Sequence, residues 1–191
     1  MSVLSARRLV MALVALAGMA ACMPAGAGGP PVEPATYRTD DYRAPTPATL
    51  AGARVVTTQE AAAIWQAGGA AFVDVLPRAP RPANLPGGTL WREKTHTNIP
   101  GSLWLADTGY GELAPAMEQY FRAGLQQITG GDRAKLLVIY CLRDCWMSWN
   151  AAKRAVSLGY TNVVWYPDGT DGWQEVGLAL AEATPAPRPE P

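Results

Sequence analysis

Strand and helix patterns alternate along the middle of this chain, and this alternation constrains the fold more than any other feature. The most apolar run, residues 136–140, is followed by a helix pattern over residues 148–158 and by another apolar run at residues 163–166. Upstream, the apolar residues 70–76 precede an amphipathic helix pattern over residues 113–128. Strands that alternate with helices predict an α/β fold with a parallel sheet and helices on both of its faces.

Capping and turn residues predict the limits of the other elements. Thr57 and Glu60 match a capping box, which predicts a helix that starts there and ends before the glycine pair at 68–69. Residues 77–101 are rich in proline and glycine and predict a long loop. Residues 171–177 predict a final turn or short helix.

The chain divides into four parts. Residues 1–27 predict a secretory signal peptide, in which Cys22 is either an acylated lipoprotein cysteine or a residue near a simple cleavage site. Residues 28–54 contain several prolines and no clear apolar period, which predicts a tether. Residues 184–191 predict a disordered, proline-rich tail for the same reason. Residues 55–183 remain as one domain.

The charge of the chain limits its partners. The sequence contains sixteen Lys and Arg residues and sixteen Asp and Glu residues. Loss of a signal peptide that contains two arginines therefore leaves a small excess of negative charge. No basic stripe remains to hold nucleic acid or anionic lipid, which leaves small molecules and proteins as partners. Export predicts a periplasmic domain, with membrane attachment only through a lipid on Cys22.

Cys141 and Cys145 lie where the most apolar strand gives way to a turn and a helix. The N–H groups of such a turn and the positive end of the helix favour a thiolate at Cys141, and Arg143 adds a positive charge nearby. Cys145 can then resolve a mixed disulfide, with Trp146 as an apolar surface beside the sulfur. The pair is therefore a candidate for catalytic thiol chemistry. An inert bridge is an alternative, although it would close a very small loop.

Other candidates for the pocket are weaker. Asp74 ends a buried strand, and it either faces the cysteine loop or caps a loop. His96, the only histidine, stands in a polar loop and is either solvated or part of the site. Asp168, Asp171 and Trp173 form a wall of the pocket or mark a turn.

A metal site is a further reading of the cysteines. Cys-x3-Cys with one distant histidine, His96, is a ligand set for copper. The order of these residues in the chain speaks against it, and we predict no bound metal. A c-type haem would need Cys-x-x-Cys-His, which is absent.

The carboxyl half of the domain resembles a rhodanese-like domain. Residues 136–177 contain an apolar strand, a cysteine loop, an Ala-Ala helix that ends in Leu-Gly-Tyr160, a strand and the triplet Asp171-Gly-Trp173. Upstream, Phe72-Val-Asp-Val75 resembles that fold's strand with its aspartate, and Asn98-Ile-Pro-Gly-Ser102 resembles its Ile-Pro-Gly turn. The resemblance implies a rhodanese-like parallel sheet flanked by helices on both faces.

Two longer stretches of sequence resemble one group of such proteins. Residues 141–154 and 165–173 are similar to the exported, PQQ-dependent catabolism-associated CXXCW motif proteins. That resemblance implies a periplasmic role beside quinoprotein alcohol oxidation and a redox or cofactor-related activity. Three residues separate the cysteines here, not the two of that family's name.

The resemblance also implies a chemistry for the loop. A sulfurtransferase of this fold carries a persulfide on the cysteine at the position of Cys141, usually with a cationic residue later in the loop. Trp146 and Met147 stand there instead, so only Arg143 could substitute. Phosphatases of related design need that late arginine to clamp a phosphate, and we disfavour this activity.

We therefore predict an exported rhodanese-like protein that handles thiols through paired cysteines in PQQ-dependent alcohol catabolism. Its expected partner is a small thiol, a persulfide or a periplasmic protein. One alternative is a thiosulfate or persulfide sulfurtransferase that uses Cys141. The other is a non-enzymatic accessory protein that binds a metal such as copper or a redox cofactor.

Overall fold

The computed structural model describes residues 29–79, 81–92 and 94–188, and its centre is a five-stranded sheet. All neighbouring strands are parallel, in the order β1-β6-β5-β2-β4. The strands are β1 (Ala53–Val55), β2 (Ala71–Asp74), β4 (Leu103–Trp104), β5 (Leu137–Tyr140) and β6 (Val163–Tyr166). The expectation of an α/β fold with a parallel sheet is confirmed.

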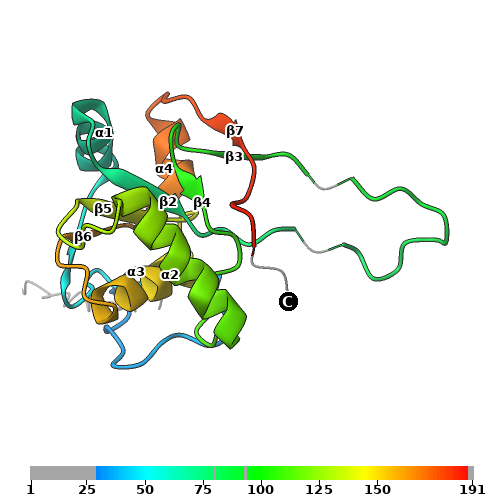
Figure 1. The fold of residues 1–191 in the computed structure, drawn as a ribbon, viewed down its shortest axis with the longest axis horizontal. Coiled ribbons are helices and arrows are strands. Elements are labelled where there is room, and N and C mark those ends of the chain that lie inside the picture. Colours follow the sequence, from blue (N-terminus) through cyan, green and yellow to red (C-terminus); the bar gives the residue numbers. More distant parts are fainter. Residues whose placement is uncertain (1–28, 80, 93, 189–191) are drawn as a thin grey trace, which may run out of the picture.

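Helices cover both faces of this sheet (Figure 1). Helices α2 (Pro115–Thr129) and α3 (Trp146–Ser157) pack on one face, and α1 (Thr58–Ala67) and α4 (Gly169–Glu175) pack on the other. Because both faces are covered, every residue of β5 and of β6 is buried. This double burial explains why the two strands are unbroken apolar runs.

Two helix starts show how local sequence acts here. The capping box is confirmed, since the Thr57 hydroxyl accepts a hydrogen bond from the Glu60 N–H and the Glu60 carboxylate accepts one from the Thr57 N–H. The Thr57 N–H and the Thr57 hydroxyl, which both donate to the carboxylate, lower the pKa of Glu60. Helix α3 begins at Trp146, two residues before the predicted start, because Cys145 occupies its N-cap.

A small second sheet differs from the sequence prediction. Strand β3 (His96–Asn98) lies inside the segment predicted as a long loop, and it pairs antiparallel with β7 (Ala181–Ala183). The predicted tail continues in contact with the domain, because the Ala186 N–H donates to the Trp104 carbonyl. Strand β3 is polar and the tail is rich in proline, and each contacts residues that are far away in the sequence. No local pattern therefore predicts these contacts.

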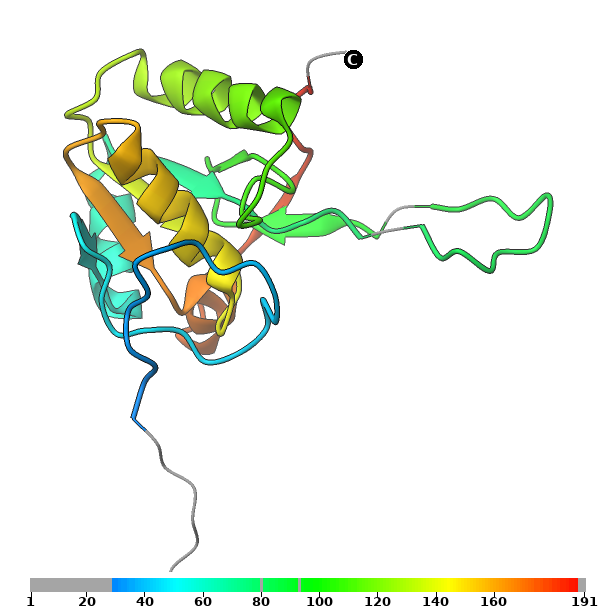
Figure 2. The same cartoon turned by 90° about the horizontal axis from the view of Figure 1, so that it is seen from below.

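The predicted tether is also packed. Residues 34–50, here called the N-terminal strap, run across helix α3 (Figure 2). Pro47 and Leu50 of the strap are buried. The low hydrophobicity of these residues predicted a tether without contacts to the domain. The strap is held instead by hydrogen bonds from donors on α3 to its carbonyl groups.

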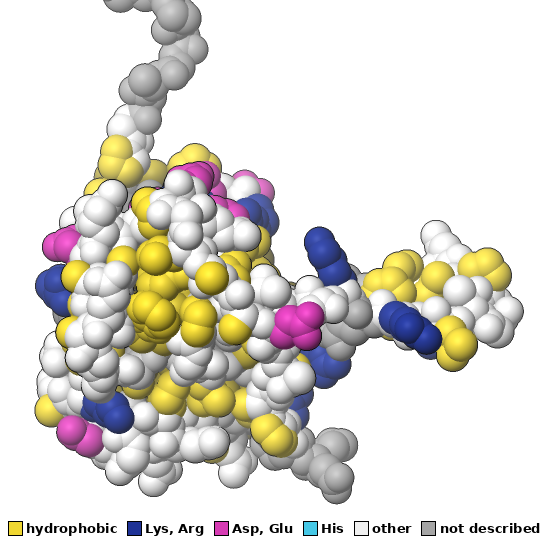
Figure 3. All heavy atoms as spheres, turned by 90° about the horizontal axis from the view of Figure 1, so that it is seen from above, with side chains coloured by type: hydrophobic (Ala, Val, Ile, Leu, Met, Phe, Trp, Pro, Cys, Tyr) yellow, Lys and Arg dark blue, Asp and Glu magenta, His cyan; other side chains and the backbone are white. Residues whose placement is uncertain are grey.

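Residues 77–79, 81–92 and 94–95 belong to an extended arm that leads away from the sheet and back (Figure 1). Leu90 on this arm is 88% exposed. The space-filling view shows basic and hydrophobic side chains along it (Figure 3).

The predicted signal peptide and Cys22 lie outside the described residues. Within the described part of the chain, no helix has the length and hydropathy needed to cross a membrane.

Candidate functional site

The two predicted catalytic cysteines are joined. Cys141 directly follows β5, Cys145 is the N-cap of α3, and a disulfide links them with their Cα atoms 6.3 Å apart. Each residue is only 1% exposed. The N-cap, where backbone N–H groups and the helix dipole favour negative charge, is thus held by Cys145. A sulfur freed there would be favoured as a thiolate.

The start of α4 holds the cysteine loop from one side. The Cys141 carbonyl accepts a hydrogen bond from the Thr170 N–H at 3.0 Å. Gly169 has a φ of 51°, and a Cβ at this position would overlap the Cys141 carbonyl oxygen. The Arg143 N–H donates to the Asp171 carboxylate at 3.0 Å. The loop therefore depends on a glycine and a carboxylate of α4 for its conformation.

Arg143 does not replace the late arginine of a sulfurtransferase loop. Its guanidinium binds Glu175 through two nitrogens, at 2.5 and 2.6 Å, and Asp168 through Nε at 3.2 Å. The hydrogen bonds to Glu175, and to a smaller extent the bond to Asp168, raise the pKa of Arg143. The Arg143 guanidinium in turn lowers the pKa of Glu175. The positive charge is thus neutralised by carboxylates on and next to α4.

Two predicted pocket tryptophans are core residues instead. Trp146 is buried under the N-terminal strap, where its ring N–H donates to the Pro45 carbonyl at 3.1 Å. Trp173 is 1% exposed, packs edge-on against Trp65 and donates to the Ala179 carbonyl. The need of a buried indole N–H for a partner explains both bonds.

Asp74 and His96 form a pair. A 2.6 Å hydrogen bond joins His96 Nε2 to Asp74 Oδ2, and Asp74 Oδ1 accepts one from the Leu76 N–H. The His96 ring lies against Trp104, with ring centroids 4.0 Å apart. His96 is therefore a largely buried residue of β3 and not a solvated loop histidine.

The sheet separates this pair from the disulfide. Successive residues of a strand point to opposite faces. In β2, Phe72 packs with the core under α1 and α4, and Asp74, two residues later, shares its face. Cys141 and Cys145 belong to the core under α2 and α3. Of the two alternatives for Asp74, the structure shows the loop cap. Its carboxylate accepts a hydrogen bond from the Leu76 N–H and is bonded to His96, and it does not face the cysteine loop.

A cavity of about 300 Å³ opens beside the Asp74–His96 pair. Leu142 of the cysteine loop forms part of its wall, whereas neither cysteine does. Several lining residues had no sequence signal of their own; they are Trp104, Thr170, Gln174 and Leu180. Their position near the carboxyl edge of a parallel sheet is the signal that could have located them.

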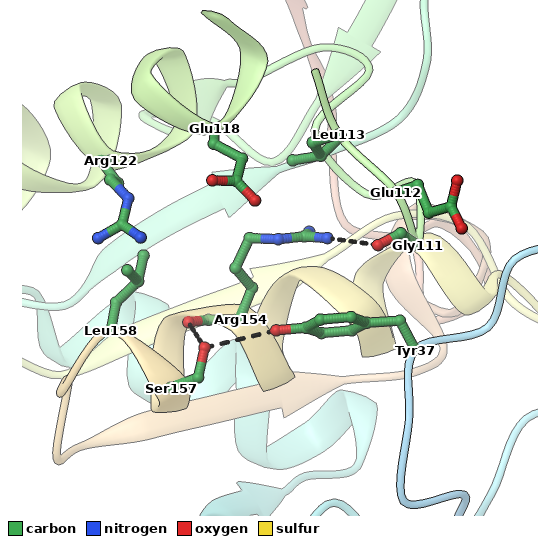
Figure 4. Close-up of a pocket in the computed structure, with 9 residues that line it drawn as sticks. All are labelled: Tyr37, Gly111, Glu112, Leu113, Glu118, Arg122, Arg154, Ser157 and Leu158. Atoms are coloured by element: carbon green, nitrogen blue, oxygen red, sulfur yellow. Dashed lines mark hydrogen bonds between the residues drawn. The ribbon is translucent and has the colours of Figure 1, made fainter. Parts of the chain in front are cut away.

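Another cavity, of about 330 Å³, lies between α2 and the carboxyl-terminal half of α3 (Figure 4). Arg154 points into it and donates to the carbonyl groups of Thr108, Tyr110 and Gly111. Burial lowers the pKa of Arg154. Through these three hydrogen bonds, Arg154 holds residues 108–111 against helix α3.

A family model described as rhodanese-like domain matches residues 57–176. The chain belongs to the rhodanese-like domain family. A search of curated proteins gives no match to this sequence.

The solved structures to which this rhodanese-like chain is similar are distant from it. The polysulfide-sulfur transferase homodimer of Wolinella succinogenes is 17% identical, with 69% of this chain and 80% of that chain covered and a TM-score of 0.44. The 3-mercaptopyruvate sulfotransferase SseA of Escherichia coli is 19% identical, with 72% and 55% covered and a TM-score of 0.44. An uncharacterized protein of Saccharomyces cerevisiae is 22% identical, with 65% and 93% covered and a TM-score of 0.39.

The rhodanese-like loop does not bring the predicted copper ligands together. His96 is bonded to Asp74, and the two cysteines are bonded to each other. Among the residues that the structure describes, no three His, Cys, Asp or Glu side chains are grouped to hold a metal ion.

The loop's own N–H groups are partly occupied. The Arg143 N–H is donated to Asp171, and the Trp146 N–H is donated to the Tyr42 carbonyl at 2.9 Å. A loop that cradles an anion needs its N–H groups directed to that anion. The N–H groups of Arg143 and Trp146 are therefore not directed to an anion in this structure.

Proposed function

We propose that this rhodanese-like protein exchanges thiols and disulfides through Cys141 and Cys145. The observation that carries the proposal is the disulfide between the cysteine after β5 and the cysteine at the N-cap of α3. A leaving thiolate departs faster when its negative charge is stabilised. The helix end supplies this stabilisation to Cys145.

The exchange proceeds in two steps. A substrate thiolate attacks the Cys141 sulfur, the Cys141–Cys145 bond breaks, and Cys145 leaves as a thiolate. A second substrate thiolate then attacks the mixed disulfide and releases an oxidised substrate disulfide. Two thiols lose two electrons, and the two cysteines accept them and become thiols after protonation.

A purely stabilising bridge explains the pair less well. The chain-entropy relation gives about 2 kcal/mol for closing a loop of this length, against about 3 kcal/mol for a 15-residue loop. The bridge also joins two segments that hydrogen bonds to α4 and the strap already hold. A bond placed only for stability would gain more by linking distant segments.

We place this chemistry in the periplasm, on an exported chain that serves PQQ-dependent alcohol catabolism. The support is the signal-like segment before residue 28 and the similarity of residues 141–154 to the CXXCW motif proteins. A periplasm that permits disulfides agrees with the bonded pair.

The test is redox titration of the folded protein in a Cys22→Ser background, so that only two cysteines remain. We expect the pair to equilibrate with a glutathione buffer, and oxidised protein to convert glutathione to its disulfide in proportion to protein reduced. Cys141→Ser and Cys145→Ser should each abolish this stoichiometry. A pair that stays oxidised in fully reduced glutathione while the fold persists would identify a structural bridge and refute the proposal.

A second candidate is persulfide transfer by Cys141. The family match favours it, because the matched residues 57–176 include Cys141, which by the sequence resemblance stands at the position of the reactive cysteine. Cys145→Ser separates the two activities. It should preserve transfer of sulfur from thiosulfate to cyanide if the persulfide forms on Cys141, whereas it should abolish thiol–disulfide exchange.

A further inference from the structure

The N-terminal strap is bound to helix α3 through its main chain. Carbonyl groups spaced three or four residues apart along the strap accept hydrogen bonds from α3; they belong to Pro34, Arg38, Tyr42, Pro45 and Thr49. The donors are side-chain groups of Trp146, Trp149, Asn150 and Lys153 and the Trp146 N–H. A surface that binds carbonyl groups can accept many sequences, because every residue has one.

One side chain of α3 also accepts a hydrogen bond from an N–H group of the strap. Asn150, which is fully buried, accepts a 2.9 Å hydrogen bond from the Arg38 N–H and donates a 2.8 Å bond to the Arg38 carbonyl. A side-chain amide that pairs with both groups of one residue holds extended chain much as a neighbouring strand would. Lys153 and Trp149 continue this surface, since the ammonium lies 4.9 Å from the ring centroid.

The middle of the strap, residues 42–45, lies at the end of α3 that follows the disulfide. Its Tyr42 carbonyl binds the Trp146 N–H, and Trp146 directly follows Cys145. Tyr42 and Ala44 pack against the core that contains both cysteines. Since each cysteine is only 1% exposed, a substrate must displace some of this covering to reach the sulfur.

We propose that the α3 surface beside the disulfide is a docking groove for an extended, thiol-bearing polypeptide and that the strap occupies it as an internal plug. The inference rests on the proposed thiol exchange and names its substrate as an extended protein segment. An incoming segment replaces strap residues 38–45 and takes over the bonds to Asn150 and Trp146. Its cysteine then reaches the Cys141–Cys145 bond, which displacement of the strap uncovers.

Two variants test the groove and the plug separately. Arg38→Pro removes the N–H that the strap donates to Asn150 and leaves the groove unchanged. Asn150→Ala removes the groove's own amide. Arg43→Ala changes an exposed strap residue and is the matched control. The measurement is the rate at which dithiothreitol reduces the disulfide in the folded, Cys22→Ser protein, followed by alkylation and mass spectrometry.

We expect Arg38→Pro and Asn150→Ala each to raise this rate at least tenfold and Arg43→Ala to leave it unchanged. A synthetic peptide of residues 36–50 should slow Arg38→Pro back towards the parent rate, because the groove is intact. The same peptide should not slow Asn150→Ala. If Arg38→Pro does not fold, amide hydrogen exchange of the parent protein decides. Strap residues 38–45 should exchange faster than β5, and equal protection of the two segments would overturn the inference.

Unchanged reduction rates in both variants, or a peptide that slows neither, would overturn the inference. Failure of the proposed function looks different. In that case the peptide slows reduction of Arg38→Pro by dithiothreitol, but Arg38→Pro without peptide, whose disulfide is accessible, does not oxidise glutathione.

Discussion

Asn150→Ala is expected to loosen the N-terminal strap at a measurable cost in stability. The side chain is fully buried and makes three hydrogen bonds with backbone groups. Two join it to Arg38, at 2.8 and 2.9 Å, and the third joins it to the Gly109 carbonyl at 3.0 Å. Alanine replaces none of them.

The expected loss follows from these bonds. A typical hydrogen bond contributes about 1 kcal/mol, and a buried group left without a partner costs about 1–3 kcal/mol. The Arg38 groups can bind water once the strap loosens, whereas the Gly109 carbonyl is buried. We therefore expect the free energy of unfolding to fall by about 3 kcal/mol.

Urea unfolding followed by far-UV circular dichroism, with the disulfide intact, measures this loss. The matched control is Asn162→Ala, because Asn162 is exposed and donates one 3.3 Å bond to the Ala134 carbonyl. It should cost less than about 0.5 kcal/mol. Equal losses for the two variants would refute the conclusion that the strap is an anchored part of the fold.

Three further predictions concern stability. Burial raises the pKa of Tyr166 to about 12, whereas in the unfolded chain it is about 10, so the free energy of unfolding falls as pH rises from about 10 through 12. Tyr166→Phe should therefore show a smaller drop in urea midpoint between pH 9 and pH 11 than the parent protein, and an equal drop would count against this assignment. Gly169→Ala should lower the free energy of unfolding by about 2–4 kcal/mol, because the methyl group meets the Cys141 carbonyl, whereas Gly130→Ala, in the left-handed region but in open space, should cost about 1 kcal/mol. Chemical denaturation compares the two variants, and matching values would contradict the steric argument. Arg154→Met should cost about 3 kcal/mol in the same assay because three carbonyls lose their donors, and a loss below about 1 kcal/mol would show that water replaces the guanidinium.

The cysteine loop shows how far the site could be predicted. An apolar strand followed by a cysteine and a helix pattern placed Cys141 at the carboxyl edge of the sheet and Cys145 near the helix start. The partners of Arg143 were beyond reach, because Glu175 lies 32 residues away and nothing local pairs the two. The same holds for the burial of Trp146, whose cover is a segment 101 residues earlier in the chain.

Local sequence determined those elements whose stability depends on neighbours in the chain. The capping box of Thr57 and Glu60 and the apolar run of β6 specified their helix and strand with almost no error. Such signals arise from the helical period, from capping and from burial on both faces, all of which a short window contains.

Tertiary structure alone decided what surrounds the cysteines. It turned a proline-rich segment into a strap on α3, paired a polar stretch at His96 with the chain's end, and put Asp74 and Cys141 on opposite faces of the sheet. The physical reason is that hydrogen bonds between polar segments form wherever the fold brings donor and acceptor together. Their sequence separation, 112 residues for Arg38 and Asn150, leaves no periodic trace in either segment.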